Sequence, residues 1–70
     1  MKLHYYPETD SLYIDLSPRP STGSREVADG VVLDFDSEDN IVGIDIQHAS
    51  LKLDLRTLET RDLPLAKAVD

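Results

Sequence analysis

The sequence predicts a small α+β, mainly β domain in which two consecutive antiparallel β-hairpins form one sheet, with a short C-terminal helix or extended segment packed on it. Apolar and polar residues alternate over residues 2–6, 12–17, 31–36 and 41–47, which is the period of a half-buried strand. Turn-forming residues separate the first run from the second and the third from the fourth. A length of 70 residues leaves room for one domain, 1–70.

The first predicted hairpin covers residues 2–17, with the turn at Pro7–Asp10. The register that keeps both apolar sets on one face pairs Leu3 with Ile14, Tyr5 with Leu12, Lys2 with Asp15 and His4 with Tyr13. The pair Lys2–Asp15 joins opposite charges, and the pair His4–Tyr13 joins two aromatic rings. Because both kinds of cross-strand neighbour are favourable, they support this register.

A flexible loop is predicted over residues 18–25, where prolines and a glycine lie among small polar residues, and the second hairpin over 26–47. A strand is expected to begin within Arg25–Ala28 and to end at Asp29-Gly30. Its turn is Ser37–Asn40, and Asp39 or Asn40 suits the left-handed position of that turn. The apolar register pairs Val31 with Ile46, Leu33 with Ile44 and Phe35 with Val42, and it sets Asp34 opposite Gly43 and Asp45 opposite Val32. No carboxylate then directly faces another, which favours this pairing.

The C-terminal segment, residues 48–70, has two interpretations. Leu51, Leu55 and Leu58 follow helical spacing. Leu51, Leu53 and Leu55 instead follow strand spacing. Asp54 is suited to cap a short helix that ends at Glu59. We expect one short helical turn on the apolar face of the sheet and then an extended stretch, and the choice between helix and strand over residues 51–63 stays open.

The chain is strongly acidic, with a net charge of −7 at pH 7. Between Glu26 and Leu51 it contains seven acidic residues and no Lys or Arg. Because binding to nucleic acids depends on cationic side chains that neutralise phosphates, we expect no direct binding of DNA or RNA. The distribution favours water, a cation or a basic protein surface as the surroundings of this stretch.

The absence of cysteine excludes disulfides and thiolate metal sites and fits a reducing cytoplasm, which is the expected location. No apolar run approaches the roughly 20 residues that span a bilayer, and the first residues have no signal-peptide core, so no membrane association is expected. A chain this short buries a thin core and leaves edge strands open. We therefore expect a homodimer, formed through the sheet edges or the apolar face.

Three blocks of sequence within residues 1–50 resemble a known family: K-L-H-Y-Y-P-E-T-D-S-L-Y-I-D-L-S, D-G-V-V-L-D-F-D and I-V-G-I-D-I-Q-H-A-S. Their order and spacing are similar to those of the small prokaryotic proteins of domain-of-unknown-function family 2283. Two positions depart from that pattern, because Tyr6 stands where a small acidic residue is commoner and Asp39 stands near a position often held by glycine. The resemblance implies no established activity. It does imply a role beside a small toxin-like partner, as the neutralising half of a toxin–antitoxin pair.

The strongest metal-like pattern is a row of alternating oxygen ligands at Asp34, Asp36, Glu38 and Asn40. A calcium loop of the EF-hand type would need Gly at the position of Asp39, a bidentate Glu at that of Asp45, and flanking helices. His4 and His48 are the only imidazoles, and their separation is not that of a zinc site. We therefore expect an acidic hairpin turn rather than a metal centre.

Catalysis has little support, since the chain contains no G-x-S-x-G, P-loop or Rossmann glycine pattern, and no enzyme activity or cofactor is expected. The leading hypothesis is a protein-binding module, with an antitoxin-like role as its specific form. Its candidate contact residues are acids of the central stretch and two exposed tyrosines: Asp34, Asp36, Glu38, Asp39, Asp45, Tyr6 and Tyr13. Two alternatives remain, a small-ligand or cation-binding domain that uses the 34–40 turn and a structural domain with no specific partner.

Overall fold

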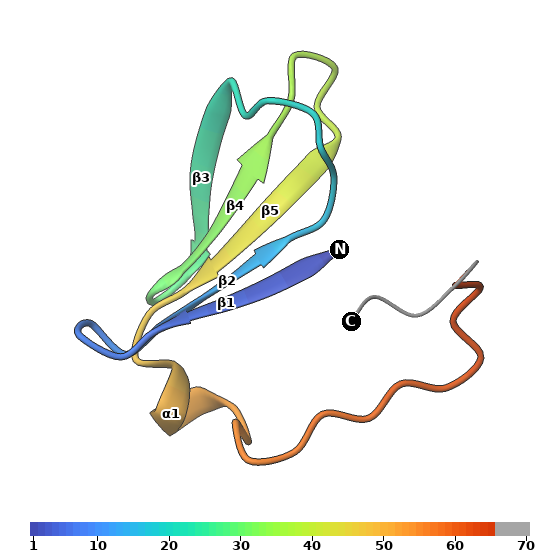
Figure 1. Ribbon diagram of the computed structural model, residues 1–70. Helices are drawn as coiled ribbons and strands as arrows, with labels where there is room; N and C mark the ends of the chain where they lie inside the picture. Colours follow the sequence, from blue (N-terminus) through green and yellow to red (C-terminus); the bar gives the residue numbers. More distant parts are fainter. Residues whose placement is uncertain (66–70) are drawn as a thin grey trace.

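A computed structural model describes residues 1–65 of the chain and shows five antiparallel strands in one sheet and one short helix (Figure 1). The elements are β1 (Lys2–Tyr6), β2 (Ser11–Asp15), β3 (Gly23–Ala28), β4 (Val31–Phe35), β5 (Ile41–Ile46) and α1 (Ala49–Lys52). Their order across the sheet is β1-β2-β5-β4-β3. The mainly β prediction is therefore confirmed.

The first hairpin, β1–β2, has the predicted register at every pair from Lys2–Asp15 to Tyr5–Leu12. Asp10 closes its turn with φ 54°, in the left-handed region that Asp tolerates better than most residues. The amide of Thr9 donates to the carbonyl of Tyr6 across the turn (3.3 Å). Here the alternation of apolar residues was enough to predict the pairing.

The hairpin β4–β5 has the predicted pairs from Val31–Ile46 to Asp34–Gly43, with one correction at its end. Phe35 pairs with Ile41 rather than with Val42, because β5 contains a bulge there. The bulge leaves Val42 buried, at 3% exposure, and its carbonyl accepts a hydrogen bond from the amide of Leu16 (2.9 Å). Asp39 takes the left-handed position in the turn, at φ 64°, as expected.

The prediction of a loop over residues 18–25 is wrong at its C-terminal end, because β3 begins at Gly23. The strand pairs with the outer edge of β4, so the expected second hairpin, 26–47, divides into part of β3 and the hairpin β4–β5. Gly30, at φ 72°, turns the chain between β3 and β4. Without β3, the outer edge of β4 would expose unpaired backbone N–H and C=O groups. The stabilisation gained by pairing with β4 therefore outweighs the low strand propensity of Gly and Ser.

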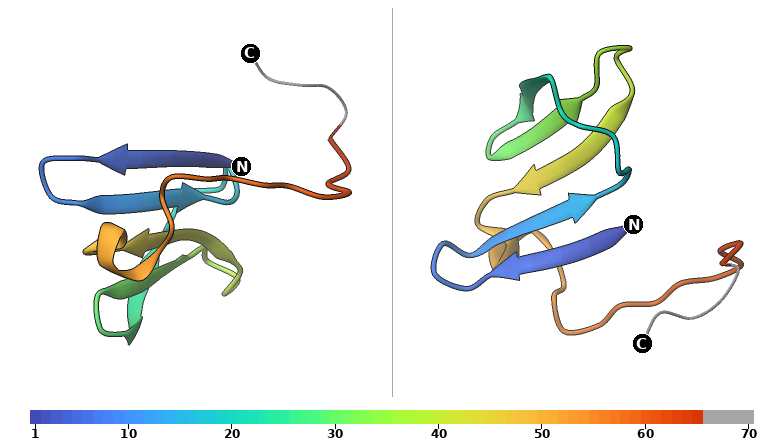
Figure 2. Two further views of the ribbon diagram at one scale, coloured as in Figure 1. Left: turned by 90° about the horizontal axis from the view of Figure 1, so that it is seen from below. Right: turned by 45° about the horizontal axis from the view of Figure 1, so that its top comes forward.

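The C-terminal segment forms a helix earlier than predicted. The helix α1 is a single turn at Ala49–Lys52, and no helix spans Asp54 to Glu59. Asp54 accepts a hydrogen bond from the amide of Arg56 (3.1 Å), so it stabilises a turn instead of capping a helix. We call residues 53–65 the C-terminal arm. It leaves α1 and runs past β1 toward the end of the sheet that holds the N-terminus (Figure 2). Residues 66–70, the end of the predicted 48–70 segment, lie outside the described residues.

The core is small. Its buried apolar side chains are Leu12, Val42, Ile46 and Ala49. Ala49 joins α1 to the apolar face of the sheet, and its amide donates to the carbonyl of Asp10 (2.8 Å). In the part of the chain that the structure describes, no helix has the length and apolar character needed to cross a bilayer.

Candidate binding face

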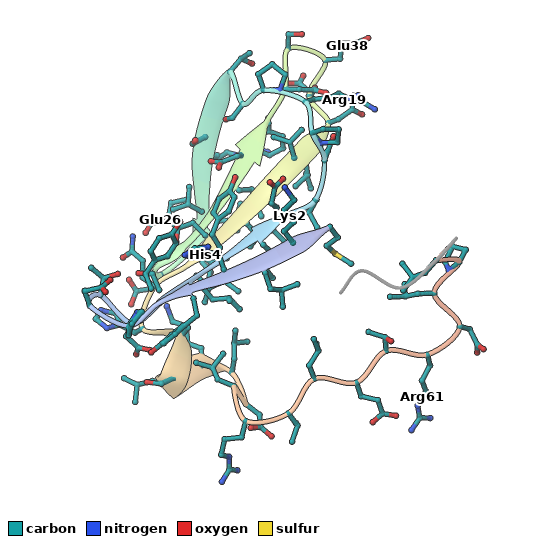
Figure 3. All side chains as sticks on the ribbon, viewed as in Figure 1. Lys2, His4, Arg19, Glu26, Glu38 and Arg61 are labelled. Atoms are coloured by element: carbon teal, nitrogen blue, oxygen red, sulfur yellow. The ribbon has the colours of Figure 1, made fainter. Side chains whose placement is uncertain are left out.

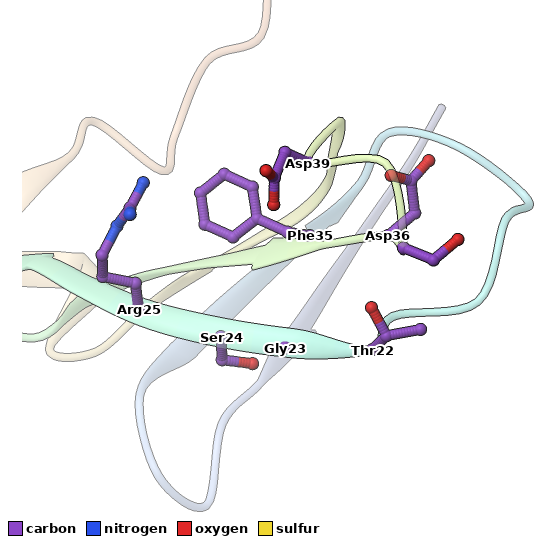
Figure 4. A pocket seen from close by; sticks show the side chains of 8 residues that line it. Thr22, Gly23, Ser24, Arg25, Phe35, Asp36 and Asp39 are labelled. Atoms are coloured by element: carbon purple, nitrogen blue, oxygen red, sulfur yellow. The ribbon is translucent and has the colours of Figure 1, made fainter.

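The strands place the polar half of their alternating residues on one side of the sheet, here called the polar face. Its members, in sheet order, are Lys2, His4 and Tyr6 on β1, Ser11, Tyr13 and Asp15 on β2, Gly43 and Asp45 on β5, Val32 and Asp34 on β4, and Ser24 and Glu26 on β3. Figure 4 shows the two sides at the β3–β4 end, with Ser24 on one side and Arg25 and Phe35 on the other. The Arg25 guanidinium lies 4.8 Å from the centre of the Phe35 ring, within cation–π range.

A hydrogen-bonded row crosses the polar face over four strands. The hydroxyl of Tyr13 donates to one carboxylate oxygen of Asp34 (2.8 Å), and the hydroxyl of Ser24 donates to the other (2.6 Å). Tyr13 on β2 reaches Asp34 on β4 by passing over Gly43 on the intervening β5, where no side chain stands in its way. The row therefore ties together strands that are not neighbours in the sheet.

Electrostatics along this row raise the pKa of Tyr13 to about 12. The largest cause is the hydrogen bond that Tyr13 donates to Asp34, followed by partial burial and by the negative charges of Asp34, Asp15 and Asp45. The phenol therefore stays protonated, and remains a donor, to a higher pH than an ordinary tyrosine. The three carboxylates all influence one hydroxyl, which shows how closely the negative charge is gathered around Tyr13.

Aromatic side chains border this acidic region on the β1 side. The rings of His4 and Tyr6 are stacked, with their centres 4.2 Å apart. Next to them lies an open hollow of about 470 Å³, lined by Tyr6, Thr9, Ser11, Tyr13, Asp34 and Asp45. The polar face therefore combines exposed aromatic rings with carboxylates, a mixture that suits contact with a protein surface.

The predicted contact residues separate into two groups. The polar face brings together Asp34, Asp45, Tyr6 and Tyr13. Asp36, Glu38 and Asp39 lie at or beside the turn between β4 and β5, where Figure 3 also places Arg19. The two groups lie at different hollows, because Asp36 and Asp39 line a second one of about 590 Å³ between β3 and the β4–β5 turn.

Asp36 has a structural role in that turn. Its buried carboxylate accepts hydrogen bonds from the amides of Glu38 (2.8 Å) and Asn40 (2.9 Å). The Asn40 side-chain amide (3.1 Å) and the Arg19 guanidinium (3.0 Å) donate to its second oxygen. These donors, above all the Asn40 backbone amide, lower the pKa of Asp36 to about 2.

Three of the four candidate metal ligands of the 34–40 turn, Asp34, Asp36 and Asn40, have other side-chain partners in the structure. Asp34 binds hydroxyls on the polar face, and the side-chain nitrogen of Asn40 is turned toward Asp36. His4 stacks on Tyr6, and His48 occupies a left-handed position directly before α1, at φ 52°. Within residues 1–65, no group of three or more His, Cys, Asp or Glu side chains is arranged to hold a metal ion.

Sequence reasoning missed three residues that organise the molecule. Gly43 and Ser24 complete the row on the polar face. Asp10 joins the first hairpin to α1, because its carboxylate accepts hydrogen bonds from the hydroxyls of Ser50 (2.6 Å) and Tyr5 (2.7 Å). Only Gly43 carried a signal, since a glycine inside a strand often marks the close approach of another group.

Comparison with known families gives a match over most of the chain. A model for the family described as proteins of unknown function, DUF2283, matches residues 2–50. The chain belongs to this family. The match covers the whole five-stranded sheet and the beginning of α1, and it ends before the C-terminal arm. Neither the curated proteins nor the solved structures give a match.

Proposed function

We propose that this member of the DUF2283 family is a protein-binding module whose polar face binds a basic surface of a partner protein. The observation that carries the proposal is the clustering of carboxylates around Tyr13. Asp15 on β2 and Asp34 on β4 stand on either side of Gly43, and Asp45 on β5 lies opposite Tyr13. A basic partner surface would offset their mutual repulsion.

The composition of the polar face supports this choice of partner. Its carboxylates are Asp15, Glu26, Asp34 and Asp45, and its one Lys or Arg is Lys2 on the edge strand β1. Complementary charge speeds the encounter of two proteins and sets their orientation. The exposed rings of His4 and Tyr6 add apolar contact area beside the charges.

The specific form that we propose is an antitoxin-like role, in which the polar face covers a basic active site or RNA-binding groove of a toxic partner. An acidic face of this kind occupies the place that phosphates would take in such a groove. A partner of this kind is harmful when produced alone and harmless when the two proteins are produced together.

The test begins with affinity capture of the tagged full-length protein from its own cells, followed by titration of the identified partner with purified protein. We expect a basic partner whose binding weakens as salt is raised. The variant Asp15→Asn/Asp45→Asn should bind it at least about tenfold more weakly, because two face charges are lost.

The matched control is Glu38→Gln/Asp39→Asn, which removes two charges from the turn and should bind like the unchanged protein. Recovery of no basic partner would refute the proposal, and so would equal losses in the two variants. Growth of cells that produce the partner alone, with and without this protein, tests the antitoxin-like form separately.

A further inference from the structure

The side of the sheet opposite the polar face, here called the apolar face, has very little cover. Along β1 and β2 it presents Leu3, Tyr5, Leu12 and Ile14, and along β5 and β4 it continues through Ile44 and Leu33. Leu3 remains 49% exposed and Tyr5 41% exposed. The single turn of α1 buries Ala49 against Leu12 and Ile46 at one place, and the described part of the chain puts no second layer over most of this face.

The C-terminal arm adds more exposed apolar surface beside that face. Leu53, Leu55 and Leu58 line a groove of about 700 Å³ whose other wall is Leu3, Tyr5, Leu12 and Ile14. The groove is open, and Leu58 is 76% exposed. Farther along the arm, Leu65 is 69% exposed. Within residues 1–65, the chain therefore supplies both an open apolar groove and apolar side chains that remain largely exposed.

The total surface is larger than that of a typical folded monomer of this mass. A folded monomer of 7.8 kDa exposes about 4,400 Å², whereas this chain exposes 5824 Å². The radius of gyration is 13.2 Å, compared with about 11 Å for a compact domain of 70 residues. The excess area exceeds the roughly 800 Å² that each partner buries in a standard interface.

The distribution of charge is compatible with a second copy of the chain as the cover of this surface. Residues 1–50 contain ten acids and three bases, which is the whole net charge of −7, whereas residues 51–65 contain three of each. Among the strand residues of the apolar face, Arg25 alone is charged. Two copies that meet through their apolar faces therefore keep their acidic polar faces on the outside, where water and salt reduce the repulsion.

We propose that the apolar face and the C-terminal arm form the interface of a symmetric homodimer, in which a second copy of the chain fills the leucine-lined groove. In a dimer with two-fold symmetry, the arm leucines of each copy fill the groove of the other, so the open groove and the exposed leucines are both buried. The two sheets then pack face to face and supply the second layer that the single chain lacks. This interface is on the opposite side from the proposed partner-binding face, so either proposal can fail without the other.

The test is the molar mass of the full-length protein, measured by size-exclusion chromatography with light scattering between about 1 and 100 µM. We expect twice the 7.8 kDa of one chain at the higher concentrations. Leu58→Asp places a charge in the groove and should raise the dimer dissociation constant at least about tenfold, because the loss of one buried leucine has an effect of that order.

The matched control is Leu51→Asp, which makes the same change at a leucine that is 84% exposed and outside the groove. It should leave the dimer intact, and circular dichroism checks that both variants fold. If Leu58→Asp does not fold, isotope-filtered NMR of the unchanged protein should show contacts between the Leu58 methyl groups of one copy and Tyr5 or Leu3 of the other.

Three results would overturn the proposal. A monomer at every concentration would show that a second copy does not cover the apolar face, and a different partner protein would then be its candidate cover. Equal dissociation of the Leu58→Asp and Leu51→Asp variants would place the interface outside the groove. A dimer without the intermolecular Leu58 contacts would mean association through the sheet edges β1 or β3.

Discussion

The polar face depends on a residue that has no side chain. Gly43 lies on β5 between Tyr13 on β2 and Asp34 on β4, and the Tyr13 ring passes over it to donate to Asp34. A Cβ atom at this position would overlap the Tyr13 hydroxyl and lie 2.6 Å from its Cζ atom. A single glycine therefore controls both the packing of this face and the position of its central donor.

The first prediction tests this dependence with Gly43→Ala. The added methyl group must displace the Tyr13 ring and break its hydrogen bond to Asp34, so we expect the free energy of unfolding to fall by about 1–3 kcal/mol. Urea denaturation at a fixed protein concentration measures the change. Gly23→Ala is the control, since a Cβ atom there meets nothing within 4 Å, and it should change stability by less than about 0.5 kcal/mol. Equal effects at the two glycines would contradict the packing of Tyr13 over Gly43.

At the scale of elements, the turn between β4 and β5 contains a pattern of acidic residues that suggests cation binding but stabilises the hairpin instead. Its alternating oxygen atoms resemble a cation loop in the sequence. In the structure, Asp36 points inward and uses its oxygen atoms to hold the amides of Glu38 and Asn40. The acidic residue is needed as a hydrogen-bond acceptor that fixes the hairpin, and this purpose depends on the direction in which the side chain points.

The second prediction concerns the pH dependence of this turn. The pKa of Asp36 is about 2 in the folded chain, below its ordinary value of 3.8. Because the folded value is the lower one, the stabilising contribution is present above about pH 4 and is lost as the pH falls toward 2. Asp36→Asn should therefore lower the melting temperature at pH 7 and flatten its decrease between pH 4 and 2. Its amide group would also turn an N–H toward donors that now bind a carboxylate.

Asp39→Asn is the control for this second prediction. It removes the same charge from the same turn, and Asn tolerates the left-handed conformation that Asp39 adopts at φ 64°. Melting curves followed by circular dichroism should resemble those of the unchanged protein. A melting temperature of Asp36→Asn as high as that of the unchanged protein at pH 7 would disprove the role of the Asp36 carboxylate.

At the scale of the whole molecule, charge and apolar surface are divided between the two sides of one sheet. The polar face gathers carboxylates, and the apolar face and the C-terminal arm gather leucines around a groove. A sheet with this division presents two surfaces of different chemistry on opposite sides. The proposed functions follow this division, a basic partner on one side and a second copy on the other.

The third prediction follows from the crowded negative charge. Raising NaCl from about 0.05 to 0.5 M shortens the range of electrostatic repulsion and should raise the urea midpoint of unfolding. Asp15→Asn/Asp45→Asn should raise the midpoint at low salt and reduce its further increase with salt. The turn variant Glu38→Gln/Asp39→Asn should respond to salt more like the unchanged protein. A midpoint that does not depend on salt would show that repulsion on the polar face has no effect on stability.

The success of the sequence-based predictions differs between parts of the chain for physical reasons. Both hairpins with clear alternation, β1–β2 and β4–β5, have the predicted registers because a slip by one residue would expose their apolar side chains. The bulge at Val42 was missed because it preserves the apolar pattern. The end of β3 was expected within Arg25–Ala28, but its beginning at Gly23 and Ser24 was missed, because these residues have a low strand propensity and only the pairing with β4 makes them a strand.

The sequence by itself determined the strands of two hairpins, their facing residues and the excess of acid over base, because local alternation and charge are properties of the chain alone. The tertiary structure decided the sheet order β1-β2-β5-β4-β3, which sets β2 beside β5 and brings Tyr13 to Asp34 over Gly43. It also decided that the C-terminal leucines line an open groove instead of covering the sheet. Both outcomes depend on contacts between residues far apart in the chain, and a local pattern contains no information about them.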